Sequence, residues 1–165
     1  MRLTPFVLCL GIAASTLSVA VSGQRPDDQI APQSMEYLAK GESLLAQGKY
    51  LEADDALETA LVVDPKNRAA FVVMAKVAIK EKLFGQAIRM TNKALSLEPT
   101  DRDALAVQGE AMVELGAVPR AKENLAKLQK LCGNSACPQA AALSTAIARG
   151  PALAAAKTPE VPKKN

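Results

Sequence analysis

The sequence predicts an all-α fold, an α-solenoid of three helical hairpins followed by a capping helix, and two observations lead to this prediction. The first is composition: the 165 residues are 49% hydrophobic but only 3% aromatic, and alanine is abundant. Small side chains let helices pack closely, whereas sheets favour β-branched and aromatic residues. The second is an internal repeat of 34 residues that places small residues at fixed positions in consecutive units.

The N-terminal segment, residues 1–23, is predicted to be a secretory signal peptide. Arg2 is followed by an apolar run over residues 6–14 and then by a softer stretch of Ser, Ala and Val. A basic start, an apolar middle and small residues before a cleavage site are typical of such leaders. Cleavage after Ala20 and cleavage after Gly23 both fit. The alternative is an uncleaved membrane anchor, although proline and hydroxyl residues dilute the apolar stretch.

Three repeat units follow a segment, residues 24–33, that is expected to be a flexible linker. The units span 34–67, 68–101 and 102–131. Large apolar residues recur at one position of the units, and small residues recur at three others. The large residues are Tyr37, Phe71 and Leu105, and the small ones are Gly41, Ala75, Gly109, Ala53, Ala87, Ala121, Ala60 and Ala94. This spacing predicts two helices per unit that cross each other at the small residues.

The turn residues divide each unit into its two helices. The predicted pairs are 34–47 with 50–63, 68–81 with 84–97, and 102–115 with 118–131. Gly48 and Gly116 follow the first helices of their units, where a left-handed residue must turn the chain, and Lys82 is a poorer equivalent. Pro65 and Pro99 end the second helices because proline cannot extend a helix.

The third unit is predicted to be closed by a further helix. Asp101 offers an N-cap at its start, but no proline ends it. A capping helix is expected over residues 138–149, with a proline at its first position and Gly150 at its end. Its apolar stripe consists of Ala142, Leu143, Ala146 and Ile147, and a repeat array needs such a helix to cover its last apolar face. Residues 150–165, with three prolines and terminal lysines, are expected to be a disordered tail.

The repeated positions resemble the tetratricopeptide repeat (TPR) family over about 98 residues in unbroken phase. Lys40 and Gln108 depart from the pattern, because the family prefers leucine at these positions. The resemblance implies a protein-binding module without enzymatic activity. It also implies that the first helices of the units line a concave groove, which binds a peptide or a helix.

Carrying the groove positions of the family over to this sequence gives ten candidate partner-binding residues. They are Leu38, Glu42 and Leu45 in the first unit, Val72, Lys76, Ile79 and Lys80 in the second, and Glu110, Val113 and Glu114 in the third. The apolar members are expected to form a stripe, with two lysines between acidic groups on either side. The alternative is that these charges pair between neighbouring repeats and that the groove is only solvated. The asparagine-and-lysine pattern by which some family members hold a C-terminal carboxylate is absent.

Two cysteines, Cys132 and Cys137, remain once a leader containing Cys9 is removed. They supply too few ligands for a zinc site, and they lack the C-x-x-C spacing of a redox pair. A structural disulfide fits better, because the protein is expected to be exported and because Gly133 and Pro138 break the helix between the two residues.

No constellation for catalysis or cofactor binding is apparent. The chain has no histidine, which removes the commonest general base and metal ligand, and it has no glycine-rich phosphate loop. Asp54 and Asp55, with Glu52 and Glu58 nearby, are expected to form a solvated face. The net charge of +3 is too small to predict binding to nucleic acid or to an anionic membrane. We therefore expect no enzyme, no cofactor and no metal.

The sequence thus predicts an exported scaffold or adaptor, periplasmic in the bacterial cell envelope, that binds a protein or peptide partner. After leader cleavage we expect no membrane association, and we expect a monomer, with homo-oligomerisation through an exposed repeat face as the alternative. Alternatives are an assembly factor for pilus or secretion machinery, or a thiol-active accessory protein that uses Cys132 and Cys137. A secreted or membrane-anchored location is the alternative to the periplasm.

Overall fold

A computed structural model of the chain describes residues 29–151, which form seven α-helices and no strand. The helices are α1 (Pro32–Ala46), α2 (Tyr50–Val63), α3 (Arg68–Lys80), α4 (Phe84–Leu97), α5 (Arg102–Glu114), α6 (Val118–Cys132) and α7 (Pro138–Arg149). Every bound lies within two residues of the predicted helix, so the all-α prediction is confirmed. The predicted signal peptide and nearly all of the predicted tail lie outside the described residues.

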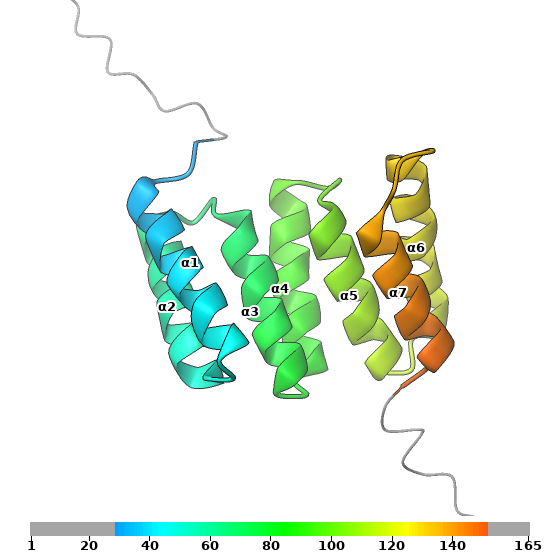
Figure 1. The fold of residues 1–165 in the computed structure, drawn as a ribbon, viewed down its shortest axis with the longest axis horizontal. Helices are drawn as coiled ribbons and strands as arrows, with labels where there is room; N and C mark the ends of the chain where they lie inside the picture. The colour runs from blue at the N-terminus through cyan, green and yellow to red at the C-terminus, as the bar shows by residue number, and fades with distance from the viewer. Residues whose placement is uncertain (1–28, 152–165) are drawn as a thin grey trace, which may run out of the picture.

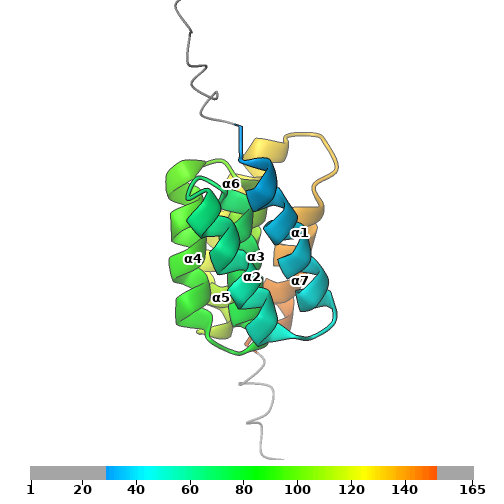
Figure 2. The same cartoon turned by 90° about the vertical axis from the view of Figure 1, so that its left-hand side faces the viewer.

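The helices form three antiparallel hairpins, α1–α2, α3–α4 and α5–α6, which stand side by side, and α7 follows at the end of the row (Figure 1). The first helices form one layer, because α1 contacts α3, α3 contacts α5, and α5 contacts α7. Figure 2 looks along the row from its α1–α2 end and shows α1 and α7 on one side and α4 on the other. The capping helix therefore takes the place that the first helix of a fourth hairpin would occupy.

The turn inside each hairpin has a left-handed residue, as the sequence predicts. The φ angles are 75° at Gly48, 63° at Lys82 and 77° at Gly116. Beyond the glycine of the first turn, the N–H of Lys49 donates to the carbonyl of Leu44 over 3.0 Å. Such a bond satisfies one of the carbonyls that a helix end leaves without a partner. The left-handed conformation is sterically unfavourable for Lys82, because its Cβ approaches the following carbonyl oxygen.

The connections between hairpins end one helix and cap the next. Helix α2 ends two residues before Pro65, and α4 ends two residues before Pro99. The side chain of Asp101 accepts a hydrogen bond of 2.8 Å from the N–H of Ala104, which confirms the predicted N-cap of α5. Asn67 plays the same part for α3, an N-cap that the sequence analysis missed.

The start of α1 corrects the linker predicted over residues 24–33, because the helix begins at Pro32. A proline fits the first helical position, where its missing N–H needs no partner. The N–H of Ala31 donates to Asp64 Oδ2 over 2.8 Å. In addition, the hydroxyl of Ser34 donates to the carbonyl of Ala60 over 2.7 Å and accepts from Asn67 Nδ2 over 2.8 Å. These bonds fix α1 to the first connection between hairpins.

Small residues mark the places where helices approach closely. The alanines at the repeated positions, such as Ala53, Ala87 and Ala121, are fully buried. A Cβ atom on Gly41 would lie 2.6 Å from Cγ of Leu57, within the first hairpin. Gly109 differs, because the side chain that covers it belongs to α7 and not to its own hairpin.

Gln108, which replaces the leucine that the family prefers, is buried in a polar network. Its Nε2 donates to Asn92 Oδ1 over 2.7 Å, and its Oε1 accepts from Asn124 Nδ2 over 3.0 Å. Asn124 Nδ2 also lies 3.1 Å from the carbonyl oxygen of Leu105. The network links α4, α5 and α6, and it satisfies the polar groups that this departure buries.

Asp54 is only partly solvated, contrary to the sequence-based expectation, whereas Glu52, Asp55 and Glu58 are exposed as expected. Among the residues that the structure describes, its buried Oδ1 atom has no hydrogen-bond partner. Burial raises the pKa of Asp54 to about 6, and nearby carboxylates add to the effect. These carboxylates belong to Glu81, Glu58 and Asp55.

Replacing Asp54 by asparagine is expected to stabilise the protein at neutral pH. The folded-state pKa of about 6 exceeds the ordinary value of 3.8, so the folded protein binds this proton more tightly than the unfolded chain does. Stability from this group is therefore greatest below about pH 4 and is lost as the pH rises through about 6. Because the side chain is partly exposed, we expect a gain in unfolding free energy of only about 1 kcal/mol near pH 7.5.

Urea denaturation at about pH 4 and about pH 7.5 measures this effect. The difference between Asp54→Asn and wild type should be near zero at the lower pH and appear at the higher one. Glu123→Gln, at an exposed carboxylate on α6, is the matched control and should show no such pH-dependent gain. An equal gain at both pH values would contradict the assignment.

Candidate functional site

The candidate site is the face formed by the first helix of each hairpin together with α7. We call it the first-helix face. It is defined by Glu42 of α1, Lys76 of α3, Glu110 of α5 and Gln139 of α7. The first three residues occupy the same position in successive repeat units, 34 residues apart. They therefore lie at matching heights on neighbouring helices. The face is a row of equivalent positions that repeats from helix to helix.

The apolar part of the predicted groove is mostly core, which corrects the expected continuous stripe. Leu38 is 5% exposed, Val72 is 4% exposed and Val113 is fully buried. Leu45 and Ile79 are half-buried. The reason is that neighbouring first helices contact each other directly and that α7 covers α5. The accessible part of the face is therefore largely polar.

The charged residues of the face are largely accessible. Glu42, Lys76 and Lys80 are exposed, and Glu110 is half-buried. Within residues 29–151, none of these four side chains forms an ion pair. The alternative that they neutralise one another between repeats is therefore not what the structure shows at these positions. The charges remain available to a ligand.

Glu114 is buried and is not accessible on the first-helix face. Its side chain is only 5% exposed, and its Oε1 accepts a hydrogen bond of 3.0 Å from Arg149 Nη2 at the end of α7. A buried carboxylate needs such a partner to offset its lost hydration. This predicted groove residue therefore serves to hold α7 in place.

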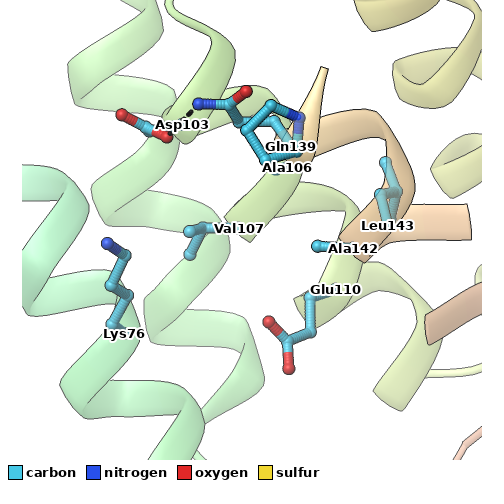
Figure 3. A pocket seen from close by; sticks show the side chains of 9 residues that line it. Lys76, Asp103, Ala106, Val107, Glu110, Gln139, Ala142 and Leu143 are labelled. Atoms are coloured by element: carbon cyan, nitrogen blue, oxygen red, sulfur yellow. Dashed lines mark hydrogen bonds between the residues drawn. The ribbon is translucent and has the colours of Figure 1, made fainter. Parts of the chain in front are cut away.

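A hollow of about 300 Å³ opens where α3, α5 and α7 meet (Figure 3). Lys76 stands on one side of it, and Asp103 and Glu110 stand on the α5 side, near opposite ends. Gln139 of α7 closes the Asp103 end, because its Nε2 donates to Asp103 Oδ1 over 3.0 Å. Ala106, Val107, Ala142 and Leu143 contribute apolar surface. The hollow thus combines an apolar lining with charges of both signs.

The residues that α7 contributes to this hollow were not among the ten candidates. The sequence predicted a helix that covers the last repeat, but the 34-residue phase breaks after residue 131. Positions on α7 could therefore not be matched to groove positions. The predicted apolar stripe of α7 is confirmed in part, because Leu143 and Ala146 are buried and Ile147 is half-buried, whereas Ala142 is exposed.

The two cysteines join the end of α6 to the start of α7. The structure places their Cα atoms 5.9 Å apart and their sulfur atoms at a bonding distance of 2.09 Å. Cys132 is buried and Cys137 is half-buried. Across the described residues, His, Cys, Asp and Glu side chains nowhere gather in threes or more to hold a metal ion. None of the helices described is long and apolar enough to cross a bilayer.

No protein-family model and no curated protein matches the sequence, but many solved structures match the fold. The first TPR domain of Spaghetti (RPAP3), solved with the HSP90 peptide SRMEEVD, is 26% identical with a TM-score of 0.63, over 74% of this chain and 94% of that domain. The Sgt2 TPR domain from Aspergillus fumigatus is 21% identical with a TM-score of 0.65, over 82% and 89%. The type III secretion translocator chaperone SycD of Yersinia enterocolitica is 17% identical with a TM-score of 0.63, over 72% and 89%.

These neighbours are TPR domains, and the hairpins of this chain keep the 34-residue phase on which the family resemblance rests. The buried alanines and the left-handed turns stand where the repeat requires them. The chain therefore has a TPR fold, as its repeated positions predict.

Proposed function

We propose that this protein is a non-enzymatic scaffold that binds a peptide segment of a partner protein on its first-helix face. The observation that carries the proposal is the row of charges without ion-pair partners beside a hollow of about 300 Å³. The RPAP3 domain with the same fold was solved with a bound peptide, which supports a peptide as the ligand here.

We expect this protein to bind its peptide in a different way from a domain that recognises an acidic peptide end. The peptide bound by the RPAP3 domain, SRMEEVD, is rich in carboxylates near its end. In this chain the row reads Glu42, Lys76, Glu110, so two of its three positions repel a carboxylate. We expect selection of a peptide that carries both basic and acidic residues.

The double substitution Lys76→Glu/Lys80→Glu is expected to weaken peptide capture strongly while the helical circular dichroism stays unchanged. Both lysines are exposed and lie on α3, so their reversal alters the charge of the face without altering the core. Peptides selected from a random display library on the wild-type chain provide the ligand, and fluorescence anisotropy measures the affinity. A loss of about tenfold or more is expected.

The matched control is Lys122→Glu/Lys127→Glu, which changes the net charge equally but on exposed positions of α6. This control should bind the selected peptides like wild type. If both double variants lose affinity equally, the effect comes from net charge and the assignment of the face is wrong.

We further propose that the protein acts in the periplasm of a bacterium after removal of its leader. The basic start and apolar run of the first 23 residues support this location. Mass spectrometry of protein from a periplasmic fraction should find an N-terminus at Val21 or at Gln24. Intact protein retained in the membrane fraction would favour the anchored alternative.

We assign the cysteine pair a structural role rather than thiol activity. Reactive cysteines sit in partly exposed, electropositive surroundings, whereas Cys132 is 7% exposed and packs at the end of α6. In the exported protein, neither thiol should react with an alkylating reagent until a reductant and a denaturant are added. Rapid alkylation of the native protein would instead support the thiol-active alternative.

A further inference from the structure

The charge pattern of the first-helix face has a complement within this chain itself. We propose that residues 157–163 of the C-terminal segment occupy the row Glu42, Lys76, Glu110 of the same molecule and compete there with a partner peptide. The inference uses the face to which the proposed function assigns peptide binding, but it does not require that an external partner exists.

The face supplies an alternating pattern of charge. The equivalent positions of the three repeats are negative at Glu42, positive at Lys76 and negative at Glu110. In the described part of the chain none of them has an ion-pair partner, although neighbouring positions carry opposite charges. A ligand that crosses the helices must therefore present a basic, an acidic and a basic group in that order.

The C-terminal segment has this order of charges at a regular spacing. Residues 157–163 read K-T-P-E-V-P-K, so Lys157, Glu160 and Lys163 follow one another at intervals of three residues. A proline precedes each of the last two charged residues, and proline favours extended polyproline II geometry. That geometry has three residues per turn, so the three charged side chains would point in one direction.

The spacing of the segment matches the spacing of the face. Three residues of polyproline II advance the chain by about 9 Å. Packed helices lie about 8–10 Å apart, and α1, α3 and α5 are packed against one another in this order. Lys157 would then meet Glu110, Glu160 would meet Lys76, and Lys163 would meet Glu42.

The C-terminal end of α7 lies close to Glu110, where the segment would begin to bind. The ion pair of Arg149 with Glu114, 3.0 Å long, fixes the last turn of α7 beside α5. Glu110 is one helical turn from Glu114 on α5, a rise of about 6 Å. Lys157 lies six positions beyond Pro151, a length of chain that can span about 20 Å, so the segment reaches Glu110 without strain.

The hollow beside Glu110 suits the side chain of Lys157. Ala106, Val107 and Ala142 give apolar surface for the methylene stem, while the ammonium group meets the carboxylate of Glu110. A segment tethered over six residues has an effective concentration of about millimolar at the face, so even a weak attraction keeps the row occupied. Competing peptides are then expected to carry the same basic–x–x–acidic–x–x–basic pattern.

Photocrosslinking of the full chain tests the inference. The probe is p-benzoylphenylalanine in place of Val161, which lies inside the segment. Irradiation at low salt should give monomeric products whose crosslinks map to α3 and α5. The crosslinks should weaken as salt is raised, because salt screens exposed charges.

Charge reversal provides the control. The tail-reversed chain carries Lys157→Glu, Glu160→Lys and Lys163→Glu, and we expect a loss of crosslinking of about fivefold or more. The face-reversed chain carries Glu42→Lys, Lys76→Glu and Glu110→Lys, and circular dichroism confirms that it is folded. Combining both reversals should restore crosslinking to within about twofold of wild type.

Three results would overturn the inference. The crosslinks could be unaffected by either charge reversal, they could map to α2, α4 and α6, or they could join two chains. Peptide capture separates this outcome from failure of the proposed function. If crosslinking is insensitive to charge but capture still depends on Lys76 and Lys80, only the tail inference falls. If crosslinking behaves as expected and no peptide is captured, the proposed function falls and the face serves the tail alone.

Discussion

Leu143→Ala is expected to lower the free energy of unfolding by about 3 kcal/mol. Leu143 is 2% exposed and is the residue of α7 that fills the space above Gly109 on α5. Truncation removes its buried methyl groups and leaves a cavity between the two helices. The two polar contacts of α7, Gln139 with Asp103 and Arg149 with Glu114, lie near its ends and do not fill this space. Urea denaturation monitored by circular dichroism measures the loss.

Gly109→Ala probes the same contact from the opposite side. A Cβ at this position would lie 2.6 Å from both Cδ atoms of Leu143, so either this buried side chain or α7 must shift. We expect a loss of about 2 kcal/mol, because overpacking costs more than the helix propensity that alanine adds. In the double variant the new methyl group occupies space that Leu143 vacates. The loss of unfolding free energy in the double variant should therefore be smaller than the sum of the two single losses by at least about 1 kcal/mol.

Gly85→Ala is the matched control for this pair of variants. Gly85 lies on the exposed side of α4, and the nearest atom to an added Cβ is 3.9 Å away. Because Gly85 is the second residue of α4 and not in its interior, alanine should change the stability there by less than about 0.5 kcal/mol. Strict additivity of Gly109→Ala and Leu143→Ala would show that α7 does not rest on Gly109.

The fold follows from sequence because each unit repeats the same local requirements. Gly48 and Gly116 can turn left-handed, Pro65 and Pro99 stop helices, and small residues recur where helices must approach, so each kind of signal occurs in at least two units. The start of α1 was placed two residues late because Pro32 was assigned to a linker, although proline is common at a first helical position.

The sequence predicts the binding site only in part, because the exposure of the groove residues depends on α7, which lies outside the repeat. Val113 and Glu114 occupy positions that the family uses for binding, but α7 covers them in this chain. Lys76 and Glu110 have equivalent positions, and the sequence alone leaves open whether they pair with each other. The repeat pattern predicts that Asp54 lies on the outer side of α2, yet one of its oxygen atoms is buried.

The other large effect is expected at the cysteine pair. Replacing both cysteines by alanine, Cys132→Ala/Cys137→Ala, should lower the free energy of unfolding by about 2 kcal/mol. The two residues are five apart in sequence, so a bond between them closes a short loop and restricts the unfolded chain. In the folded state α7 remains held by Leu143 and by its two polar contacts. The circular dichroism of the native protein should therefore stay unchanged while its thermal midpoint falls.

A reductant distinguishes the effect of the bond from the effect of the substitutions. Wild-type protein purified under oxidising conditions should lose the same stability in reductant, whereas the alanine variant should not respond. The variant should also keep its affinity for selected peptides, because the lining of the hollow at Lys76, Asp103 and Glu110 does not include either cysteine. If reductant leaves the thermal midpoint of wild type unchanged, the sulfur atoms are not bonded in the purified protein, and α7 is held by packing and its polar contacts alone.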